Sequence, residues 1–216
     1  MMKTILCFGD SNTWGYDPVA SESSPFPIRH SVAKRWAGVC AEVLESDYRI
    51  VEEGQNGRTT VHDDPLMPHT NGQNYLPACL ESHKPIDLVV LMLGTNDLKT
   101  KFNLSAGEIA SGAGILARSI LKSEAGPGGR APKVLLVTPP VIEDMSGLPE
   151  LAEKFAGARE KSLKFPEAYE AVAKELGCQF LNTQLIIETS KIDALHLEEG
   201  AHEKLGEAIA AAVKGI

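Results

Sequence analysis

The chain has 216 residues and a net charge of −8 at pH 7, and no basic stretch offsets its acidic residues. This length fits one hydrophobic core, so we expect a single domain over 1–216. The charge argues against a nucleic-acid partner. No window approaches the ~20 apolar residues of a membrane span, and the apolar run Ile5–Phe8 is too short for a signal peptide. We therefore expect a cytoplasmic protein that binds neither nucleic acid nor membranes.

Short apolar runs predict the strands of a sheet, in chain order Thr4–Phe8, Tyr48–Glu53, Asp87–Leu93, Lys133–Thr138 and Gly177–Leu181. The third run is nearly all apolar, which is typical of a strand buried on both faces. Helical patterns alternate with these runs over Val32–Leu44, Ala106–Lys122, Glu167–Leu176 and Glu199–Val213. The alternation predicts an α/β fold. We expect a single-domain three-layer sandwich, with a central, mostly parallel five-stranded sheet in flavodoxin-like order and helices on both faces.

Polar segments follow the predicted strands, at the edge where sheets of this kind bind ligands. They are Gly9–Thr13 after the first strand, Gly54–Thr60 after the second, Gly94–Asp97 after the third and Asp193–His196 after the last. Together they supply a hydroxyl, flexible backbone N–H donors, a carboxamide, a carboxylate and an imidazole. Acyl transfer requires these groups.

Each of these residues also has a purely structural explanation. Ser11 could cap a helix, Gly57 could serve a tight turn, and Asn96 could cap a helix begun by Asp97. An Asp-x-x-His pair is a weak signal by itself. The sequence lacks both the Gly-x-x-x-x-Gly-Lys of phosphate-binding loops and the Gly-x-Ser-x-Gly of common α/β-hydrolases.

The ordered set is more specific than its parts. Gly-Asp-Ser-x-Thr, a glycine after the second strand, Gly-Thr-Asn-Asp and a late Asp-x-x-His resemble the four blocks of the SGNH (GDSL) hydrolase family, from Thr4 to about Val213. The resemblance is closer to the bacterial arylesterase and acyltransferase branch, on Ile5–Ser11, Glu52–Gly54, Arg58–Thr60, Tyr75–Pro77 and Met92–Asp97. The segments Pro18–His30 and Ser146–Phe165 match that branch less well.

The residues and the resemblance imply the same serine esterase mechanism, with no metal and no cofactor. Ser11 is the expected nucleophile, His196 the general base and acid, and Asp193 the carboxylate that orients the imidazole. An oxyanion hole is expected from the N–H groups of Ser11 and Gly57 and from the side chain of Asn96.

Further residues are candidates for the substrate pocket. Trp14 and Tyr16 follow the nucleophile closely enough to wall it, although Trp14 could equally pack in the core. Leu195 is expected to face the acyl group, Asn12 adjoins Ser11, and the resemblance adds Phe155. Because Trp14, Tyr16 and Leu195 leave little room, we expect acetyl to butyryl esters as substrates. An alcohol or a peroxide could compete with water for the acyl-enzyme.

The remaining cysteines, histidines and acidic pairs predict no metal site. The four cysteines lie far apart, which suits buried free thiols in a reducing compartment better than zinc or disulfides. Histidines outside the triad lack metal spacing and are interpreted as surface or capping residues; they are His30, His62, His69, His83 and His202. The pair Asp63-Asp64 is interpreted as a solvated turn.

Other functions stay open at this stage. A phosphotransferase could use Asp10 as its nucleophile, but such enzymes commonly place a second Asp where this chain has Asn12. A catalytically silent α/β binding module would need no triad. The natural ester could be an acetylated sugar, an aryl ester or a short-chain lipid. The resembling branch contains homo-oligomers, and Pro18–Pro27 is the candidate contact for such an assembly.

Overall fold

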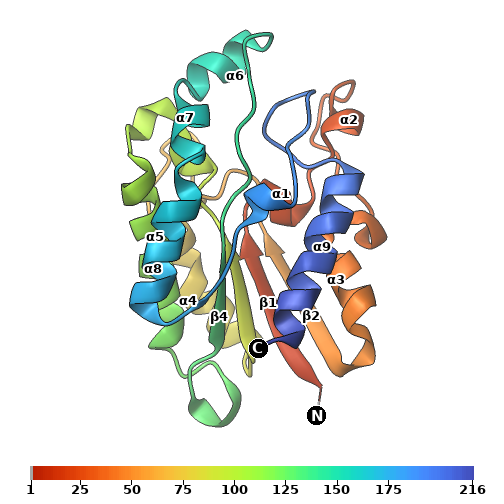
Figure 1. Cartoon of the computed structure of the whole chain (residues 1–216), viewed down its shortest axis with the longest axis vertical. Helices are drawn as coiled ribbons and strands as arrows, with labels where there is room; N and C mark the ends of the chain where they lie inside the picture. Colours follow the sequence, from red (N-terminus) through yellow and green to blue (C-terminus); the bar gives the residue numbers. More distant parts are fainter. Residues whose placement is uncertain (1) are drawn as a thin grey trace.

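A computed structural model describes residues 2–216 and contains a sheet of parallel strands in the order β2-β1-β3-β4-β5 (Figure 1). The strands are β1 (Lys3–Gly9), β2 (Tyr48–Gly54), β3 (Leu88–Met92), β4 (Lys133–Val137) and β5 (Gln179–Leu181). This arrangement confirms the predicted α/β fold and the flavodoxin-like strand order. The predicted strand ends differ from the observed ones by at most two residues.

Helices cover both faces of the sheet. One layer contains α3 (Trp36–Leu44) and α9 (Glu199–Lys214); the other contains α4 (Gly72–His83), α5 (Ala106–Leu121) and α8 (Phe165–Leu176) (Figure 1). Successive side chains of a strand point to opposite faces. On β1, Ile5 and Cys7 therefore pack toward the first layer, whereas Leu6 and Phe8 pack toward the second. The central strands are apolar throughout because both faces are covered.

The observed helices correct the predicted ones in two places. The helix expected over Val32–Leu44 begins only at Trp36, because Arg35 has an extended backbone and Val32–Lys34 forms a separate 3-10 turn. The side chain of Arg35 holds this bend, since it donates to both carboxylate oxygens of Glu52 at 2.6 and 2.9 Å. Helix α4 was not predicted, because its interior Pro77 interrupts the helical pattern.

Four shorter helices lie around the ends of the strands. They are α1 (Ser11–Trp14), α2 (Pro18–Ser21), α6 (Pro149–Lys154) and α7 (Ala158–Ser162). Their lengths of four to six residues are too short for a 3.6-residue period to show in the sequence. No helix within residues 2–216 is long and apolar enough to cross a bilayer.

The carboxyl ends of β1, β2 and β3 meet at one edge. Gly9 at the end of β1 is in register with Gly54 of β2 on one side and with Met92 of β3 on the other. A Cβ on Gly54 would lie 2.1 Å from the backbone nitrogen of Trp14, so glycine is required where α1 crosses the strand end. The segments that follow these three strands are thereby neighbours.

Candidate active site

Ser11 is the first residue of helix α1, directly after β1. Asp10 caps this helix, and its carboxylate accepts the N–H of Asn12 at 3.0 Å. The helix ends after Trp14 at Gly15, which has a left-handed backbone with φ 88°. The interpretation of Ser11 as the helix cap is therefore wrong, since Asp10 has that role. The Ser11 hydroxyl is left for other contacts.

The structure brings Ser11, His196 and Asp193 together in one chain of hydrogen bonds. The Nε2 atom of His196 lies 2.9 Å from the Ser11 Oγ, and its Nδ1 lies 2.6 Å from the Asp193 Oδ2. Ser11 is 5 % exposed, and the side chains of His196 and Asp193 are 12 % and 17 % exposed. A hydroxyl, an imidazole and a carboxylate in this order form the arrangement of a catalytic triad.

Asp193 also shapes the loop that carries it. Its second oxygen, Oδ1, accepts the backbone N–H groups of Leu195 and His196 at 3.0 and 2.9 Å. Burial raises the pKa of this carboxyl, but the hydrogen bonds from the His196 imidazole and from the two N–H groups outweigh it. The net effect lowers the Asp193 pKa. The carboxylate is thus charged across the neutral pH range.

Asn12 fixes the same loop from the other side. Its Nδ2 donates to the carbonyl of Leu195 at 3.3 Å, and its Oδ1 accepts the N–H of Leu197 at 3.1 Å. Because Asn12 follows Ser11 directly and is 1 % exposed, these bonds tie the nucleophile helix to the backbone on either side of His196. The side chain predicted as a pocket residue is therefore engaged in positioning the loop.

Asn96 and Gly57 lie on the segments that follow β3 and β2, the two strands that pair with β1. Asn96 is the first residue of a 3-10 turn after β3, and Thr95 stands at the N-cap position, so Asn96 is not the cap that the alternative interpretation required. One N–H of its amide donates to the carbonyl of Arg58 at 3.1 Å, which leaves the second N–H for another acceptor. Gly57 has φ 80°, and a Cβ there would lie 2.3 Å from the Met67 methyl. Within residues 2–216, the N–H groups of Ser11 and Gly57 have no protein acceptor.

Asp97 is a buried anchor for the segment after β2. Its carboxylate accepts the N–H and the hydroxyl of Thr60, the hydroxyl at 2.6 Å, and lies 3.0 Å from the Nδ1 of His62. The Asn96 side chain donates to the carbonyl of Arg58, which is two residues before Thr60. Neighbouring side chains of the Gly94–Asp97 segment therefore fix the backbone that carries Gly57.

Arg58 binds the ends of strands β1 and β2. Its position in the Arg58–Thr60 segment did not indicate this role. Its guanidinium donates to the carbonyls of Gly9, at 2.7 Å, and of Glu53. It also lies 4.3 Å from the centre of the Phe8 ring, a cation–π distance. Only 2 % of Arg58 is exposed, and burial lowers the pKa of the guanidinium. A buried charge in this position locks β1 and β2 together below Ser11.

The remaining pocket candidates differ in how they meet the site. Tyr16 stacks on the His196 imidazole, with ring centres 4.0 Å apart and planes inclined by 26°. Trp14 is partly exposed and carries the guanidinium of Arg29, 5.2 Å from its ring centre. Leu195 and Phe155 are 8 % and 4 % exposed and belong to one hydrophobic cluster. Tyr16 is therefore the candidate in direct contact with the triad.

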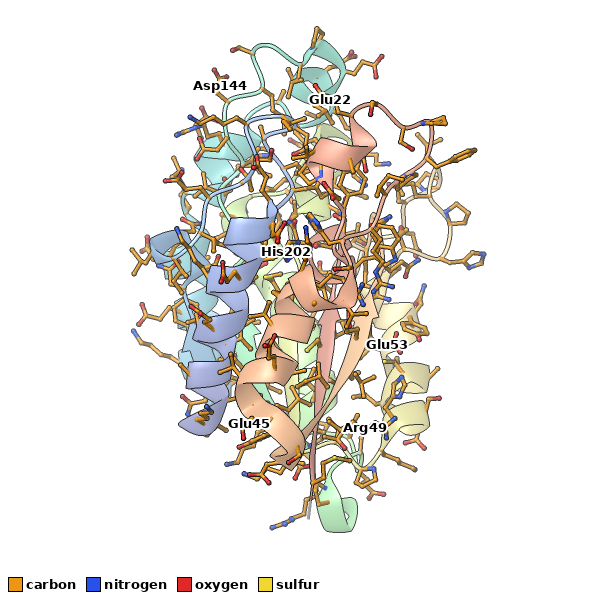
Figure 2. All side chains as sticks on the ribbon, turned by 90° about the vertical axis from the view of Figure 1, so that its right-hand side faces the viewer. Glu22, Glu45, Arg49, Glu53, Asp144 and His202 are labelled. Carbon is orange, nitrogen blue, oxygen red and sulfur yellow. The ribbon has the colours of Figure 1, made fainter. Side chains whose placement is uncertain are left out.

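Several polar residues lie in other environments than the sequence suggested. Asp64 is 3 % exposed rather than in a solvated turn, because Lys99 and Lys101 both pair with it. His202 is fully buried, and its Nδ1 accepts the Trp36 N–H at the start of α3, so it is a capping residue but not a surface one (Figure 2).

The other histidines divide between buried, half-buried and exposed positions. His30 is buried and lies 3.1 Å from an Asp17 oxygen. His62 and His83 are half-buried beside carboxylates, and His69 is exposed. The cysteines are free, as predicted: Cys7, Cys40 and Cys79 are buried and Cys178 is half-buried.

Asp10 is poorly placed to act as a nucleophile. It is 1 % exposed, and its carboxylate is occupied as the cap of α1. Burial is the largest influence on its carboxyl group and raises the pKa to about 6. The structure therefore favours Ser11 over Asp10 at this turn, and with it acyl transfer over phosphoryl transfer.

The chain belongs to the GDSL-like Lipase/Acylhydrolase family, whose model matches residues 7–204. It is similar to Est24, a carbohydrate acetylesterase from Sinorhizobium meliloti, with 43 % identity, a TM-score of 0.93 and 99 % of each chain covered. It is also similar to the aryl esterase of M. smegmatis, with 40 % identity, a TM-score of 0.93 and 99 % of each chain covered. No curated protein sequence matches the chain. With the site described above, these similarities define a carboxylic ester hydrolase of the SGNH type.

Proposed function

We propose that this chain hydrolyses short-chain carboxylic esters, from acetyl to butyryl, through an acyl-enzyme on Ser11. The observation that carries the proposal is the unbroken chain of hydrogen bonds from Ser11 through His196 to Asp193. Each participating group lies on a backbone segment that is fixed by buried polar contacts. Such preorganisation is what acyl-transfer catalysis requires.

The proposed reaction has two half-reactions. Ser11 Oγ attacks the ester carbonyl while His196 Nε2 takes the hydroxyl proton, and the intermediate collapses as His196 returns that proton to the leaving alkoxide. Water then loses a proton to His196, attacks the acyl group and releases the acid and the Ser11 hydroxyl. The Asp193 carboxylate holds the imidazole in the required tautomer and stabilises its charged form.

Charge on the carbonyl oxygen develops at a place with several donors. The N–H groups of Ser11 and Gly57 and the second N–H of the Asn96 amide are proposed to bind it. Gly57 suits this role because its left-handed backbone, with φ 80°, favours glycine, and because its N–H has no protein acceptor within residues 2–216.

The proposed acyl size follows from the residues around the triad. Tyr16 lies flat against the imidazole at 4.0 Å, and Leu195 is held between the triad residues by the bond from Asn12. Trp14 is proposed to form the outer wall, where Arg29 restrains its ring. We propose that these side chains restrict the acyl group to small sizes, and the acetylesterase similar to this chain supports acetyl esters as substrates, including acetylated sugars.

Acyl transfer to other nucleophiles is proposed as a side activity. Once the acyl-enzyme has formed, any nucleophile that reaches the carbonyl beside His196 can replace water. In the presence of a short alcohol, we expect the product mixture to contain the transferred ester, and with hydrogen peroxide the peracid. The ratio of transfer to hydrolysis would measure how well water is excluded.

A series of p-nitrophenyl esters tests the proposed function. We expect kcat/KM to be highest for acetate to butyrate and to fall for longer chains. Ser11→Ala should lose ~10⁴-fold or more, because the triad acts as a unit. A serine-directed organophosphate should label the wild type once and leave Ser11→Ala unlabelled. A folded Ser11→Ala protein with near wild-type activity would remove Ser11 from the mechanism, and an unlabelled wild type would favour a silent binding module.

We also propose that the chain forms a homo-oligomer through the segment Pro18–Pro27. Val19 and Phe26 in this segment are large apolar side chains that are 52 % and 74 % exposed, so a contact with a second copy through this segment would remove apolar surface from water. Light scattering coupled to size exclusion should give a multimer for the wild type and a smaller species for Phe26→Ser. A monomeric wild type would contradict the proposal.

A further inference from the structure

A cluster of three metal-ligating side chains lies between β2 and α4, outside the proposed active site. Glu53 is on β2, and Cys79 and His83 are on α4; Figure 2 shows Glu53 beside that helix. One carboxylate oxygen, the Cys79 Sγ and one His83 ring nitrogen all lie within 4.8 Å of one another. Residues four apart share one face of a helix, so Cys79 and His83 both point toward the strand.

The donor set suits zinc. Thiolate sulfur, imidazole nitrogen and carboxylate oxygen are its three common protein ligands, and three of them leave a fourth position for water. The Glu53 Oε1 and the His83 Nε2 are 2.6 Å apart. Ligand atoms around a tetrahedral zinc are about 3.5 Å apart, given bonds of ~2.0–2.3 Å. Side-chain rotations that move two of the ligand atoms by about 1 Å therefore accommodate the ion.

The surroundings of the cluster support ligation. The other Glu53 oxygen, Oε2, accepts the hydroxyl of Tyr75 at 3.0 Å, an outer contact of the kind that orients metal-binding carboxylates. Cys79 is 1 % exposed, whereas the side chains of His83 and Glu53 are 23 % and 18 % exposed. The sulfur is thus at the closed end and the other ligands are at the open end, which provides a path for the ion and its water.

We propose that Glu53, Cys79 and His83 bind one Zn²⁺ ion that joins helix α4 to strand β2. On binding, the Sγ–H bond of Cys79 breaks and its proton is released to solvent. The Nε2 of neutral His83 gives up the proton of its hydrogen bond to Glu53 while Nδ1 takes up a proton from solvent, and Nε2 and the Glu53 carboxylate then each bind the metal. No electron is transferred.

The neighbouring charges set the expected strength. Arg58 donates to the Glu53 carbonyl and lies on the inner side of the cluster, so it opposes a cation there. The ion and Arg58 together carry three positive charges against two from the thiolate and the carboxylate. We therefore expect weaker binding than at a structural zinc site with four protein ligands.

The position of the site gives it a structural role next to the proposed chemistry. Glu53 precedes Gly54, over which α1 crosses, and its carbonyl is bound by the same Arg58 that binds the Gly9 carbonyl. An ion at Glu53 would therefore restrain the strand end beneath Ser11 without touching the reacting groups.

Cobalt(II) titration of the untagged, reduced protein tests the site, because a cobalt–thiolate bond gives a near-ultraviolet charge-transfer band. We expect the band to saturate at one Co²⁺ per chain and to disappear when Zn²⁺ displaces the cobalt. Cys79→Ser should abolish the band. His83→Gln should weaken Co²⁺ binding by more than ~100-fold, beyond the ~10–100-fold cost of losing an outer contact. Cys178→Ser, which removes a half-buried cysteine elsewhere, should leave the titration unchanged.

Thermal unfolding provides a second readout that does not depend on Cys79→Ser folding well. Zn²⁺ should raise the Tm of the wild type and of Cys178→Ser, and should leave the Tm of His83→Gln unchanged. The site is disproved if the wild type shows no thiolate band. It is also disproved if the band survives in a folded Cys79→Ser protein, or if Zn²⁺ stabilises His83→Gln as much as the wild type.

Discussion

Two aspartate–histidine pairs lie at the carboxyl edge of the sheet, and their surroundings differ more than their own geometry. The Nδ1 of His196 is 2.6 Å from Asp193, and the Nδ1 of His62 is 3.0 Å from Asp97. The second nitrogen of His196 reaches the Ser11 hydroxyl at 2.9 Å. His62 instead lies beside the Phe102 ring with 30 % of its side chain exposed, and no hydroxyl is near its second nitrogen within residues 2–216.

The two carboxylates also differ in the other groups that donate hydrogen bonds to them. Asp193 accepts two N–H groups of its own loop, so it shapes the turn that presents His196. Asp97 is fully buried and accepts the N–H and hydroxyl of Thr60, so it fixes the segment that carries Gly57. We infer that the Asp193–His196 pair moves protons and that the Asp97–His62 pair fixes the backbone. An Asp–His contact acquires a catalytic role only when its free nitrogen meets a nucleophile.

Replacing the two histidines by glutamine should give the largest difference between the pairs. His196→Gln removes the proposed base, and we expect kcat to fall by ~10⁵–10⁶-fold, as in other triads. His62→Gln keeps a hydrogen-bond donor for Asp97, so its kcat should stay within ~10-fold of the wild type. Initial rates on p-nitrophenyl acetate measure both.

Circular dichroism and urea midpoints serve as the folding control for both variants. Equal losses of activity in two folded proteins would refute the distinction between the pairs.

Asp193→Asn should affect both the rate and its pH dependence. An amide in this place favours the wrong imidazole tautomer, and a loss of ~10⁴-fold in kcat is the usual result. The charged carboxylate also favours the imidazolium, so the acid limb of kcat/KM should lie at lower pH in the variant than in the wild type. Because its contacts keep the pKa of Asp193 below the ordinary value, its own titration should not appear near neutral pH.

The control for this variant is Asp97→Asn, which should change stability while leaving the acid limb where it is. An unmoved limb in Asp193→Asn would assign the base to a group other than His196.

Asn96→Ala tests whether the Gly94–Asp97 segment contributes chemistry as well as support. Loss of one oxyanion donor usually lowers kcat by ~10²–10³-fold with little change in KM. The matched control is Asn71→Ala, a buried amide that caps α4, which should lose ~1 kcal/mol of stability and little activity. A raised KM with unchanged kcat in Asn96→Ala would instead indicate ground-state binding.

The fold could be predicted from the sequence because its signals are local. Consecutive residues of the first and third strands are apolar, which indicates that both faces are covered. The alternation of strands and helices predicts a parallel sheet. The triad residues could also be predicted from the sequence. Ser11 stands just after a predicted strand, and Asp193 and His196 are three residues apart. Helix α4 was missed since Pro77 weakens its local pattern.

Contacts between distant segments could not be predicted. Asp64 is buried because Lys99 and Lys101 reach it from beyond β3, and nothing near Asp64 in sequence shows this. The amide of Asn12 is paired with the backbone of Leu195 and Leu197, at the far end of the chain. Sequence patterns place side chains on elements, but the partners of buried polar groups depend on tertiary packing.

The smallest expected effect is the contribution of His62 to stability, and its pH dependence has a definite sign. The hydrogen bond from His62 to Asp97 is the largest influence on the histidine and raises its pKa, with burial acting against it. The folded protein therefore binds the His62 proton more tightly than the unfolded chain, in which histidine titrates near ~6.5. The stabilisation is complete below that value and is lost as the pH rises through the higher pKa of the folded state. His62 is partly exposed, so the difference between wild type and His62→Gln should be below ~1 kcal/mol. In urea unfolding, the free energy of unfolding of the wild type should exceed that of His62→Gln at about pH 5.5. The difference should be smaller at about pH 8.5, on the other side of the ordinary histidine pKa.

His202 provides an internal contrast of opposite sign. Burial lowers its pKa to about 3, so its protonation opposes folding as the pH falls below ~6.5. His202→Gln should therefore reduce the loss of stability in acid. A wild-type advantage over His62→Gln that does not change with pH would show that Asp97 holds the neutral form of His62, and would contradict the raised pKa.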